Sequence, residues 1–351
     1  MTVRSVTAAE ATAAASRFDQ LIDVRSPAEF AQDHLPGAVN WPVLDDEQRR
    51  IVGTLYTQVS PLQARKTGAA MAARNIADHL DRWVADKARE WQPLVYCWRG
   101  GQRSGTLAWF LDQVGFRTAR LQGGYKAFRA LVRDELQSLP AGLQLQVLWG
   151  RTGSGKTRLL HALAAEGAQV LDLEGLAGHR GSVLGALPGT PQPSQKRFDT
   201  LCWERLRAFD RQRPVFVEAE SRKIGALRVP ETLVQQLREH GRCIRVDLDE
   251  AARVQLLLQE YGHFAGDAEG FCRLLEGLVE LRGRELVRGW QAQARAGRWA
   301  EVFASLMRLH YDPLYERSFR SGYRLIEQGA TLRLDDAGPL AMRDAARRLL
   351  A

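Results

Sequence analysis

The strongest constraint on the fold is a glycine-rich segment near the middle of the chain that fits the pattern G-x-x-x-x-G-K-[ST]. Its residues are Gly150, Arg151, Thr152, Gly153, Ser154, Gly155, Lys156 and Thr157. The apolar residues 145–149 predict a strand before it, and residues 158–165 are compatible with a helix after it. The glycines would let consecutive backbone N–H groups point at a phosphate, and the helix N-terminus would add partial positive charge. The sequence therefore predicts a phosphate-binding loop in a parallel α/β sheet.

Two groups of acidic residues are candidates for a metal site beside this loop. We expect Lys156 to reach the terminal phosphate oxygens and Thr157 to ligate Mg²⁺, which also needs carboxylate ligands. The candidates are Asp172 with Glu174, after one predicted strand, and Glu218 with Glu220, after another. The sequence leaves open which group takes part.

A second candidate site surrounds Cys97, between a predicted strand at 93–96 and a predicted helix at 104–114. Its loop consists of Trp98, Arg99, Gly100, Gly101, Gln102 and Arg103. The helix dipole and the two arginines favour the nucleophilic thiolate, and the glycines let backbone amides surround an anion carried on sulfur. We therefore expect a catalytic cysteine at the tip of a loop. This interpretation requires an uncovered sulfhydryl at position 97 and an open loop at 150–157.

The remaining cysteines have a simpler interpretation. Cys202, Cys243 and Cys272 lie in helical or strand patterns, far apart and without a CxxC pair, so we expect reduced thiols packed in cores. No apolar run approaches the roughly 18 residues needed to span a bilayer, and the N-terminus lacks the apolar block of a signal peptide. We expect a cytoplasmic protein.

The charge of the chain is compatible with a polyanionic partner. The formal net charge is +8, and only six of the 49 basic residues are lysines. This excess of arginine fits either a GC-rich genome or a nucleic-acid surface, and charge alone does not decide between them. Candidates for contacts with nucleic-acid phosphates are Arg282, Arg284, Arg288 and Arg295, for which a solvated helix face is an equal explanation.

Two α/β domains are expected in the 351 residues. In the first, 1–138, strands at 20–24, 93–96 and 120–121 alternate with helical patterns. A linker at 138–142 precedes the second domain, 139–351. Further strands are predicted in the second domain at 145–149, 170–172, 215–217, 244–248 and 331–334, with a mostly helical segment at about 250–328.

The N-terminal motifs resemble a rhodanese domain over residues 15–135. The segments that carry this resemblance are 21–30, 34–38, 97–103 and 121–125. A rhodanese domain followed by a phosphate-loop domain is similar to the tRNA 2-selenouridine synthase family. Further segments agree with that family, namely 52–56, 171–182, 217–222 and 310–315. Residue 219 departs from the expected pattern, because alanine stands where an acid is expected between Glu218 and Glu220.

The resemblance implies a transferase that acts on the wobble uridine of tRNAs for Lys, Glu and Gln. There, a 5-substituted 2-thiouridine becomes 2-selenouridine, with selenophosphate as donor, and a selenophosphate-producing enzyme is the expected partner. The family also transfers a geranyl group from geranyl diphosphate to the sulfur, which gives an S-geranyl intermediate. Geranylation converts a poor leaving group into a thiol that departs readily.

The residues suggest how these steps are divided. We expect the phosphate loop to hold the diphosphate of geranyl diphosphate, with a nucleotide as the competing ligand, and Cys97 to take or position selenium. An anticodon base could stack on Trp98 or Tyr125, although packing is the more common role of such rings. The rival functions are a nucleotide-dependent rhodanese-type sulfurtransferase and a sulfur-relay protein.

Overall fold

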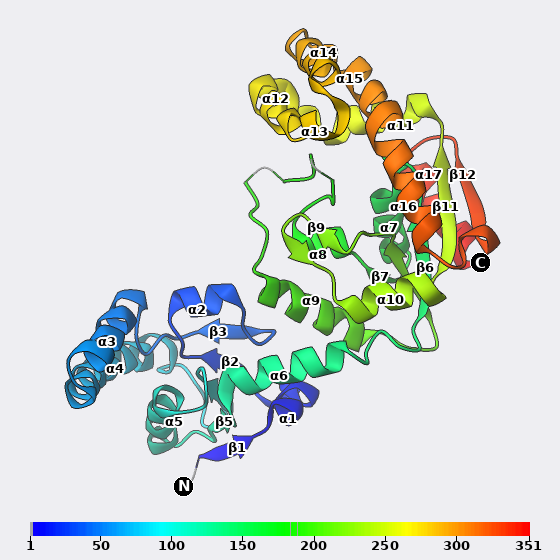
Figure 1. The fold of residues 1–351 in the computed structure, drawn as a ribbon. Helices are drawn as coiled ribbons and strands as arrows, with labels where there is room; N and C mark the ends of the chain where they lie inside the picture. Colours follow the sequence, from blue (N-terminus) through cyan, green and yellow to red (C-terminus); the bar gives the residue numbers. More distant parts are fainter. Residues whose placement is uncertain (1–2, 183, 188) are drawn as a thin grey trace. The chain divides into compact units, whose positions relative to one another are not determined.

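The protein is described by a computed structural model that covers residues 3–182, 184–187 and 189–351 (Figure 1). Its contacts divide the chain into two compact units. One contains Met1–Gln137 with Pro193–Glu204, and the other contains Ser138–Gln192 with Arg205–Ala351. Within the described residues, no helix is both long and apolar enough to cross a membrane.

The N-terminal unit is built on a five-stranded parallel sheet, in agreement with the predicted α/β class. The strand order is β1 (Arg4–Val6), β5 (Ala119–Leu121), β4 (Pro93–Tyr96), β2 (Gln20–Asp23) and β3 (Ala38–Asn40). All four residues of β4 are buried, as expected for an inner strand of a parallel sheet. This strand carries the chain directly to Cys97.

Six α-helices flank these strands (Figure 1). They are α1 (Ala8–Ala13), α2 (Pro27–Gln32), α3 (Asp46–Gln58), α4 (Pro61–Trp83), α5 (Gln102–Val114) and α6 (Gly124–Leu136). Helices α3 and α4 occupy the long stretch between β3 and β4 and pack against each other. Each has a local start signal: Asp45 forms a capping box with Gln48, and Ser60 caps α4 ahead of Pro61.

A segment from much later in the chain completes the N-terminal unit. Helix α9 (Gln195–Ala208) contributes Thr200, whose hydroxyl donates to Asp33 Oδ2 at 3.0 Å. The ring of Trp203 meets Phe128 edge-on, with centroids 5.6 Å apart. The expected division at residue 138 did not assign this segment to the first unit. Its partners are distant in sequence, so no local pattern indicates them.

The C-terminal unit contains a second parallel sheet of five strands. The strand order is β12 (Ala330–Leu334), β11 (Arg242–Leu248), β6 (Gln144–Trp149), β8 (Pro214–Glu218) and β7 (Gln169–Leu171). Helices α7 (Lys156–Ala165) and α17 (Pro339–Leu350) pack together beside it, over a core that includes Leu148, Leu160 and Val246. Because β6 is the central strand, the phosphate loop that follows it lies at the middle of the sheet edge.

Smaller elements connect these strands. They are α8 (Leu173–Ala177), β9 (Lys223–Ile224), β10 (Leu227–Arg228) and α10 (Glu231–His240). Strands β9 and β10 form an antiparallel pair outside the main sheet.

The predicted helical segment at about 250–328 forms a cluster with its own core (Figure 1). Its helices are α11 (Glu250–Glu260), α12 (Ala268–Glu276), α13 (Val279–Arg282), α14 (Arg284–Arg295), α15 (Trp299–Leu306), a π-helical turn (Met307–Tyr311) and α16 (Asp312–Gly322). Trp290 is 1% exposed and Phe271 is fully buried, so the apolar faces of these helices meet in one core. The predicted last strand is present as β12.

Candidate active site

The phosphate loop requires glycine at specific positions. Gly155 caps the start of α7 with φ +81°, and a Cβ there would lie 2.5 Å from Met342 Cε. A Cβ on Gly150 would lie 2.3 Å from the carbonyl oxygen of Val246 on the neighbouring strand. A side chain at Gly150 would therefore push the loop away from its sheet, and at Gly155 the positive φ favours glycine.

Lys156 lies among the carbonyls of its own loop. Its Nζ donates to the carbonyl of Gly150 at 2.9 Å and is 3.4 Å from that of Arg151. The same Nζ lies 5.1 Å from the ring centroid of Tyr315 on α16. The lysine charge therefore lies beside the loop, on the side that Tyr315 covers.

Helices α11 and α16 hold the outside of the loop. Arg253 on α11, which is 2% exposed, donates to the carbonyl of Thr152 at 2.8 Å and binds Asp312 through two hydrogen bonds. Arg151 binds Glu316 at 2.8 Å. The 310–315 segment has no local signal of a site beyond its family resemblance. The structure adds a physical role, because this segment contacts the phosphate loop.

A cavity of about 730 Å³ lies beside the loop. Its lining includes Thr152 to Thr157, four glutamates and a set of tyrosines and leucines from the helical cluster. Three of the glutamates are Glu174, Glu218 and Glu220, the fourth is Glu260, and the tyrosines are Tyr261, Tyr311 and Tyr315. The cavity therefore combines an anion-binding edge with carboxylates and an apolar wall.

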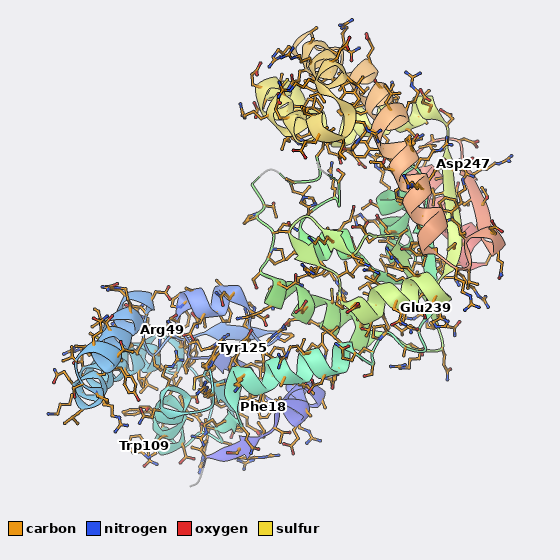
Figure 2. The ribbon with its side chains drawn as sticks, in the orientation of Figure 1. Phe18, Arg49, Trp109, Tyr125, Glu239 and Asp247 are labelled. Carbon is orange, nitrogen blue, oxygen red and sulfur yellow. The ribbon has the colours of Figure 1, made fainter. Side chains whose placement is uncertain are left out.

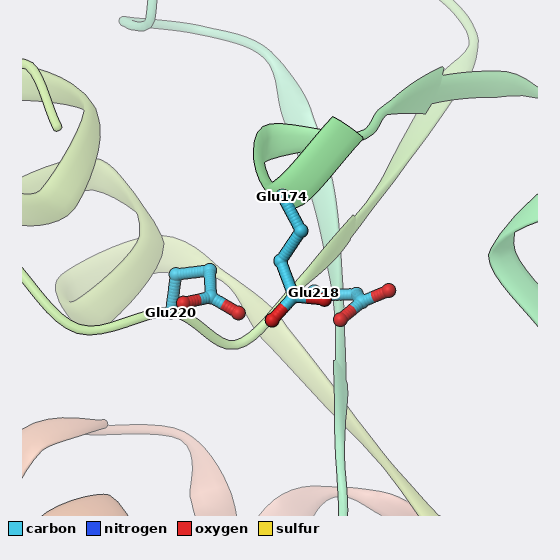
Figure 3. Close-up of side chains that lie close together, drawn as sticks. All are labelled: Glu174, Glu218 and Glu220. Carbon is cyan, nitrogen blue, oxygen red and sulfur yellow. The ribbon is translucent and has the colours of Figure 1, made fainter. Parts of the chain in front are cut away.

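The three glutamates converge on one point (Figure 3). One carboxylate oxygen from each of Glu174, Glu218 and Glu220 lies within 4.8 Å of the others. Glu174 comes from the short helix α8, whereas Glu218 and Glu220 come from the end of β8. The cluster therefore combines one residue of the first predicted acidic group with both residues of the second.

Asp172 lies outside this cluster, although it lines the same cavity. Its carboxylate accepts from Gly175 N at 2.7 Å, which caps α8, and lies 2.8 Å from His161 Nε2. These contacts engage the carboxylate at the helix N-terminus, so Asp172 is less available to a metal than the three glutamates.

Burial and mutual repulsion make this cluster unfavourable for three negative charges. Burial, followed by the charges of Glu218 and Glu220, raises the pKa of Glu174 to about 10. Burial and the charge of Glu218 raise the pKa of Glu220 to about 8. Burial also raises the pKa of Glu218, while Lys156 and a hydrogen bond with Thr157 oppose that shift. Glu218 is 3% exposed, and its Oε1 has no hydrogen-bond partner among the described residues.

Cys97 lies at the base of its loop rather than at an exposed tip. The residue is 3% exposed and packs in the core of the N-terminal unit, so the prediction of an uncovered sulfhydryl is wrong. The start of α6 packs back onto the loop, where Tyr125 N donates to the Cys97 carbonyl at 2.8 Å. Ser104 Oγ donates to Cys97 Sγ at 3.2 Å. A reagent must therefore pass the residues of the loop to reach the sulfur.

The first residue of α6, Gly124, packs directly against the backbone of the loop around Cys97. A Cβ on Gly124 would lie 2.2 Å from the Cys97 carbonyl oxygen and 2.5 Å from Gly100 N. Arg103 donates to Glu29 at 2.8 Å, which engages one of the two guanidinium groups expected beside the thiol. Arg99 is exposed. Arg99 is thus the better placed of the two to meet an incoming anion.

Of the two predicted stacking residues, Tyr125 is a packing residue. It is 2% exposed, its hydroxyl donates to Asp33 Oδ2 at 2.8 Å, and Arg25 lies 3.8 Å from its ring centroid. Figure 2 labels it within the N-terminal unit. Trp98 is half-buried, with its ring 5.4 Å from that of Tyr125. Only Trp98 keeps part of its surface accessible to a base.

Two of the four arginines proposed to contact RNA are engaged elsewhere. Arg282 donates to His310 Nδ1 at 3.0 Å, and Arg295 binds Glu269 at 2.6 Å. Arg284 and Arg288 are exposed on α14. The other three cysteines are buried, at 0%, 2% and 2% exposure, as the sequence predicted.

Comparison with known proteins gives consistent matches. A family model described as "tRNA 2-selenouridine synthase AAA domain" matches residues 143–272, and one described as "Rhodanese-like domain" matches residues 7–131. A tRNA 2-selenouridine synthase from Verminephrobacter eiseniae is 36% identical over 346 residues, which cover 88% of this chain and 92% of that protein.

Two further curated proteins with the same description are similar. The one from Aeromonas salmonicida is 34% identical over 324 residues, covering 84% of this chain and 86% of that protein. The one from Nitrosomonas europaea is 38% identical over 245 residues, covering 69% of this chain and 63% of that protein. The match thus spans less than two thirds of the Nitrosomonas protein and most of the other two.

Proposed function

We propose a function that follows from the family to which this chain belongs, the tRNA 2-selenouridine synthase family. The protein converts a wobble 5-substituted 2-thiouridine of tRNA into 2-selenouridine through an S-geranyl intermediate. The observation that carries the proposal is the cavity in which the phosphate loop, Lys156 and three carboxylates face one another. The expected substrates are tRNAs for Lys, Glu and Gln. A selenophosphate-producing enzyme would supply the donor, and both reactions would take place in the cytoplasm.

In the first step, the phosphate loop holds the diphosphate of geranyl diphosphate. The thiocarbonyl sulfur attacks the first carbon of the geranyl group, the carbon–oxygen bond breaks and pyrophosphate leaves with the proton from N3 of the base. Backbone amides of residues 150–157 and Lys156 stabilise the charge that develops on the departing pyrophosphate. The loop thus contributes most where charge increases during the reaction.

The carboxylate cluster fits a divalent cation. Three carboxylates and the Thr157 hydroxyl are hard oxygen donors, the ligands that Mg²⁺ prefers, and the unpartnered Oε1 of Glu218 is available to it. Thr157 and Glu218 would hold the ion, with Glu174 and Glu220 beside them. When bound, the ion supplies positive charge that offsets both the carboxylates and the diphosphate.

In the second step, selenium replaces the alkylated sulfur. The selenium of hydrogen selenophosphate attacks C2 of the base, and the carbon–sulfur bond breaks to release geranyl thiol. Water cleaves the selenium–phosphorus bond to give phosphate, and the two remaining protons go to N3 and to the thiol. Cys97 positions the selenium anion, and Arg99 at the exposed part of the loop attracts it. Because the thiol is buried, this role requires the 98–103 loop to admit a small anion.

The first test is geranyl transfer to 2-thiouridine tRNA by the purified full-length protein without nucleotide. We expect transfer to proceed and to be lost in Lys156→Ala. A strict requirement for ATP or GTP would contradict the assignment of the phosphate loop and favour the nucleotide-dependent sulfurtransferase.

The second test separates the two steps. Cys97→Ser should abolish selenation and leave geranylation intact, as measured by mass spectrometry of tRNA nucleosides. If both steps survive the substitution, Cys97 is not involved. In a deletion strain, both 2-selenouridine and the geranylated nucleoside should disappear, and re-expression of the chain should restore them.

A further inference from the structure

A small apolar recess adjoins the cavity at the phosphate loop. It has a volume of about 20 Å³ and shares five lining residues with the larger cavity. The shared residues are Thr152, Ser182, Leu257, Tyr261 and Tyr311. The others are Leu184, Phe303, Leu306 and Met307, all from the core of the helical cluster. The phosphate loop therefore borders directly on an apolar core.

The contact between the loop and this recess is close. A Cβ on Gly153 would lie 3.1 Å from Leu257 Cγ, and Thr152 itself lines both spaces. A group attached to a phosphate in the loop would thus meet Leu257 and Tyr261 first. Leu257 lies in the C-terminal half of α11 and Tyr261 is the residue that follows this helix. Arg253 of the same helix donates a hydrogen bond to the carbonyl of Thr152.

The chemistry of the lining indicates what that group is. None of the nine described residues that line the recess carries a charge, and their only polar side-chain groups are hydroxyls. A nucleobase is recognised by donors and acceptors aimed at its edge, whereas a hydrocarbon binds by removal of apolar surface from water. The recess therefore suits a hydrocarbon better than a base.

We propose that this recess and the adjoining leucine and tyrosine wall form the subsite for the hydrocarbon end of the diphosphate ester, and that Phe303 and Met307 limit the chain length. This inference rests on the proposed function. Phe303 is 4% exposed and Met307 is 1% exposed, so both lie on the core side of the recess. Met307 follows Phe303 by four residues, so the two side chains lie on one face of the helix, at the point where α15 continues into the π-helical turn.

The test uses the full chain and measures binding of inorganic pyrophosphate, geranyl diphosphate, the longer farnesyl diphosphate and ATP by calorimetry. Leu257→Trp fills the entrance of the recess, and Met307→Ala enlarges its far end. Leu275→Ala is the matched control, because Leu275 is fully buried in the same core and does not line the recess. Lys156→Ala reports on the phosphate loop.

We expect geranyl diphosphate to bind the wild type at least about tenfold more tightly than pyrophosphate, because the ester buries apolar surface. Leu257→Trp should remove that difference without changing the affinity for pyrophosphate. Met307→Ala should shift the preference toward farnesyl diphosphate by about tenfold, and Leu275→Ala should keep the wild-type preference.

Equal affinities of the wild type for pyrophosphate and geranyl diphosphate would overturn the subsite, as would tighter binding of ATP than of geranyl diphosphate. If Leu257→Trp does not fold, the proposal is still tested by the wild-type affinities for geranyl diphosphate, pyrophosphate and ATP and by the chain-length preference of Met307→Ala. Pyrophosphate binding that survives Lys156→Ala would instead contradict the proposed role of the phosphate loop. The two failures are therefore distinguishable.

Discussion

The Nζ atom of Lys156 lies 5.1 Å from the ring centroid of Tyr315, and the hydroxyl of Tyr315 accepts a hydrogen bond from Gly150 N at 3.4 Å. One side chain on α16 thus contacts both ends of the phosphate loop. A ring face attracts a cation, so Tyr315 helps to keep the lysine beside the loop.

Substitution of Tyr315 should weaken diphosphate binding slightly when only the hydroxyl is removed and more when the ring is removed as well. Tyr315→Phe keeps the ring and should change the affinity for pyrophosphate by no more than about threefold. Tyr315→Ala removes the ring as well and should lower that affinity by about tenfold. Calorimetric titration with pyrophosphate measures both. Equal losses in the two variants would show that the hydroxyl, not the ring, is the important group.

Metal binding should depend on the glutamate cluster and not on Asp172. We expect Mg²⁺ or Mn²⁺ to raise the melting temperature of the wild type by a few degrees, since an ion that binds only the folded state stabilises it. Glu218→Gln should lose this increase and, without metal, should be at least as stable as the wild type because a buried carboxylate is removed. Differential scanning fluorimetry measures both effects.

The control for this prediction is Asp172→Asn, which tests the other acidic group that the sequence offered. It should retain the metal-dependent increase in melting temperature, whatever it costs as a helix cap. An equal loss in Asp172→Asn and Glu218→Gln would contradict the assignment of the cluster.

The contribution of His310 to the stability of the C-terminal unit should fall in mild acid, whereas Glu174 and Glu220, whose pKa values are raised, contribute in the opposite direction. Burial, followed by the charge of Arg282, lowers the pKa of His310 below its usual value of 6.5. The unfolded chain then takes up the proton more readily, so this contribution is present above about pH 6.5 and is lost as the pH falls from there through the folded-state pKa. The slope should be at most about 1.4 kcal/mol per pH unit.

Urea denaturation at several pH values between about 7 and 5, a range that includes the usual histidine pKa, measures the His310 contribution to the unfolding free energy. His310→Gln should remove the His310 contribution, so that the unfolding free energy of the variant falls less, or rises more, than that of the wild type as the pH is lowered. His240→Gln, at an exposed histidine, should leave that dependence unchanged. A wild-type slope that persists in His310→Gln would mean that other groups control acid stability.

The N-terminal unit should depend on a residue that lies beyond the phosphate loop in sequence. Trp203 is 3% exposed, meets Phe128 edge-on and donates from Nε1 to Glu135 at 2.7 Å. Trp203→Ala should therefore cost about 3–5 kcal/mol of unfolding free energy. Trp109→Ala, at a tryptophan that is 54% exposed, should cost less than about 1 kcal/mol. Similar losses in the two variants would contradict the packing of α9.

Local patterns were enough to predict much of this fold. Strands at 20–24, 93–96, 145–149 and 244–248 are apolar runs bounded by turn residues, and β2, β4, β6 and β11 are found there. The phosphate loop was equally predictable, because its glycines, lysine and threonine are consecutive in sequence. Their geometry depends on a strand before them and a helix after them, and both are encoded nearby.

Other features depend on residues that are distant in sequence. The convergence of Glu174 with Glu218 and Glu220 arises because β7 and β8 are neighbours in the sheet, and strand order is not written in any local pattern. The same holds for α9, whose partners Asp33 and Phe128 precede the phosphate loop. Cys97 was predicted to be exposed at the tip of a loop, yet it is buried in the core of the N-terminal unit with residues such as Val24, which is distant in sequence.

Which residues can bind a phosphate or form a thiolate is already set by the amino-acid order, since these properties belong to the side chains and their immediate neighbours. The tertiary structure decided which carboxylates meet, which of them caps a helix instead, and how accessible the sulfur is. Those outcomes follow from packing between elements, because burial and mutual charge depend on neighbours that only the folded chain brings together.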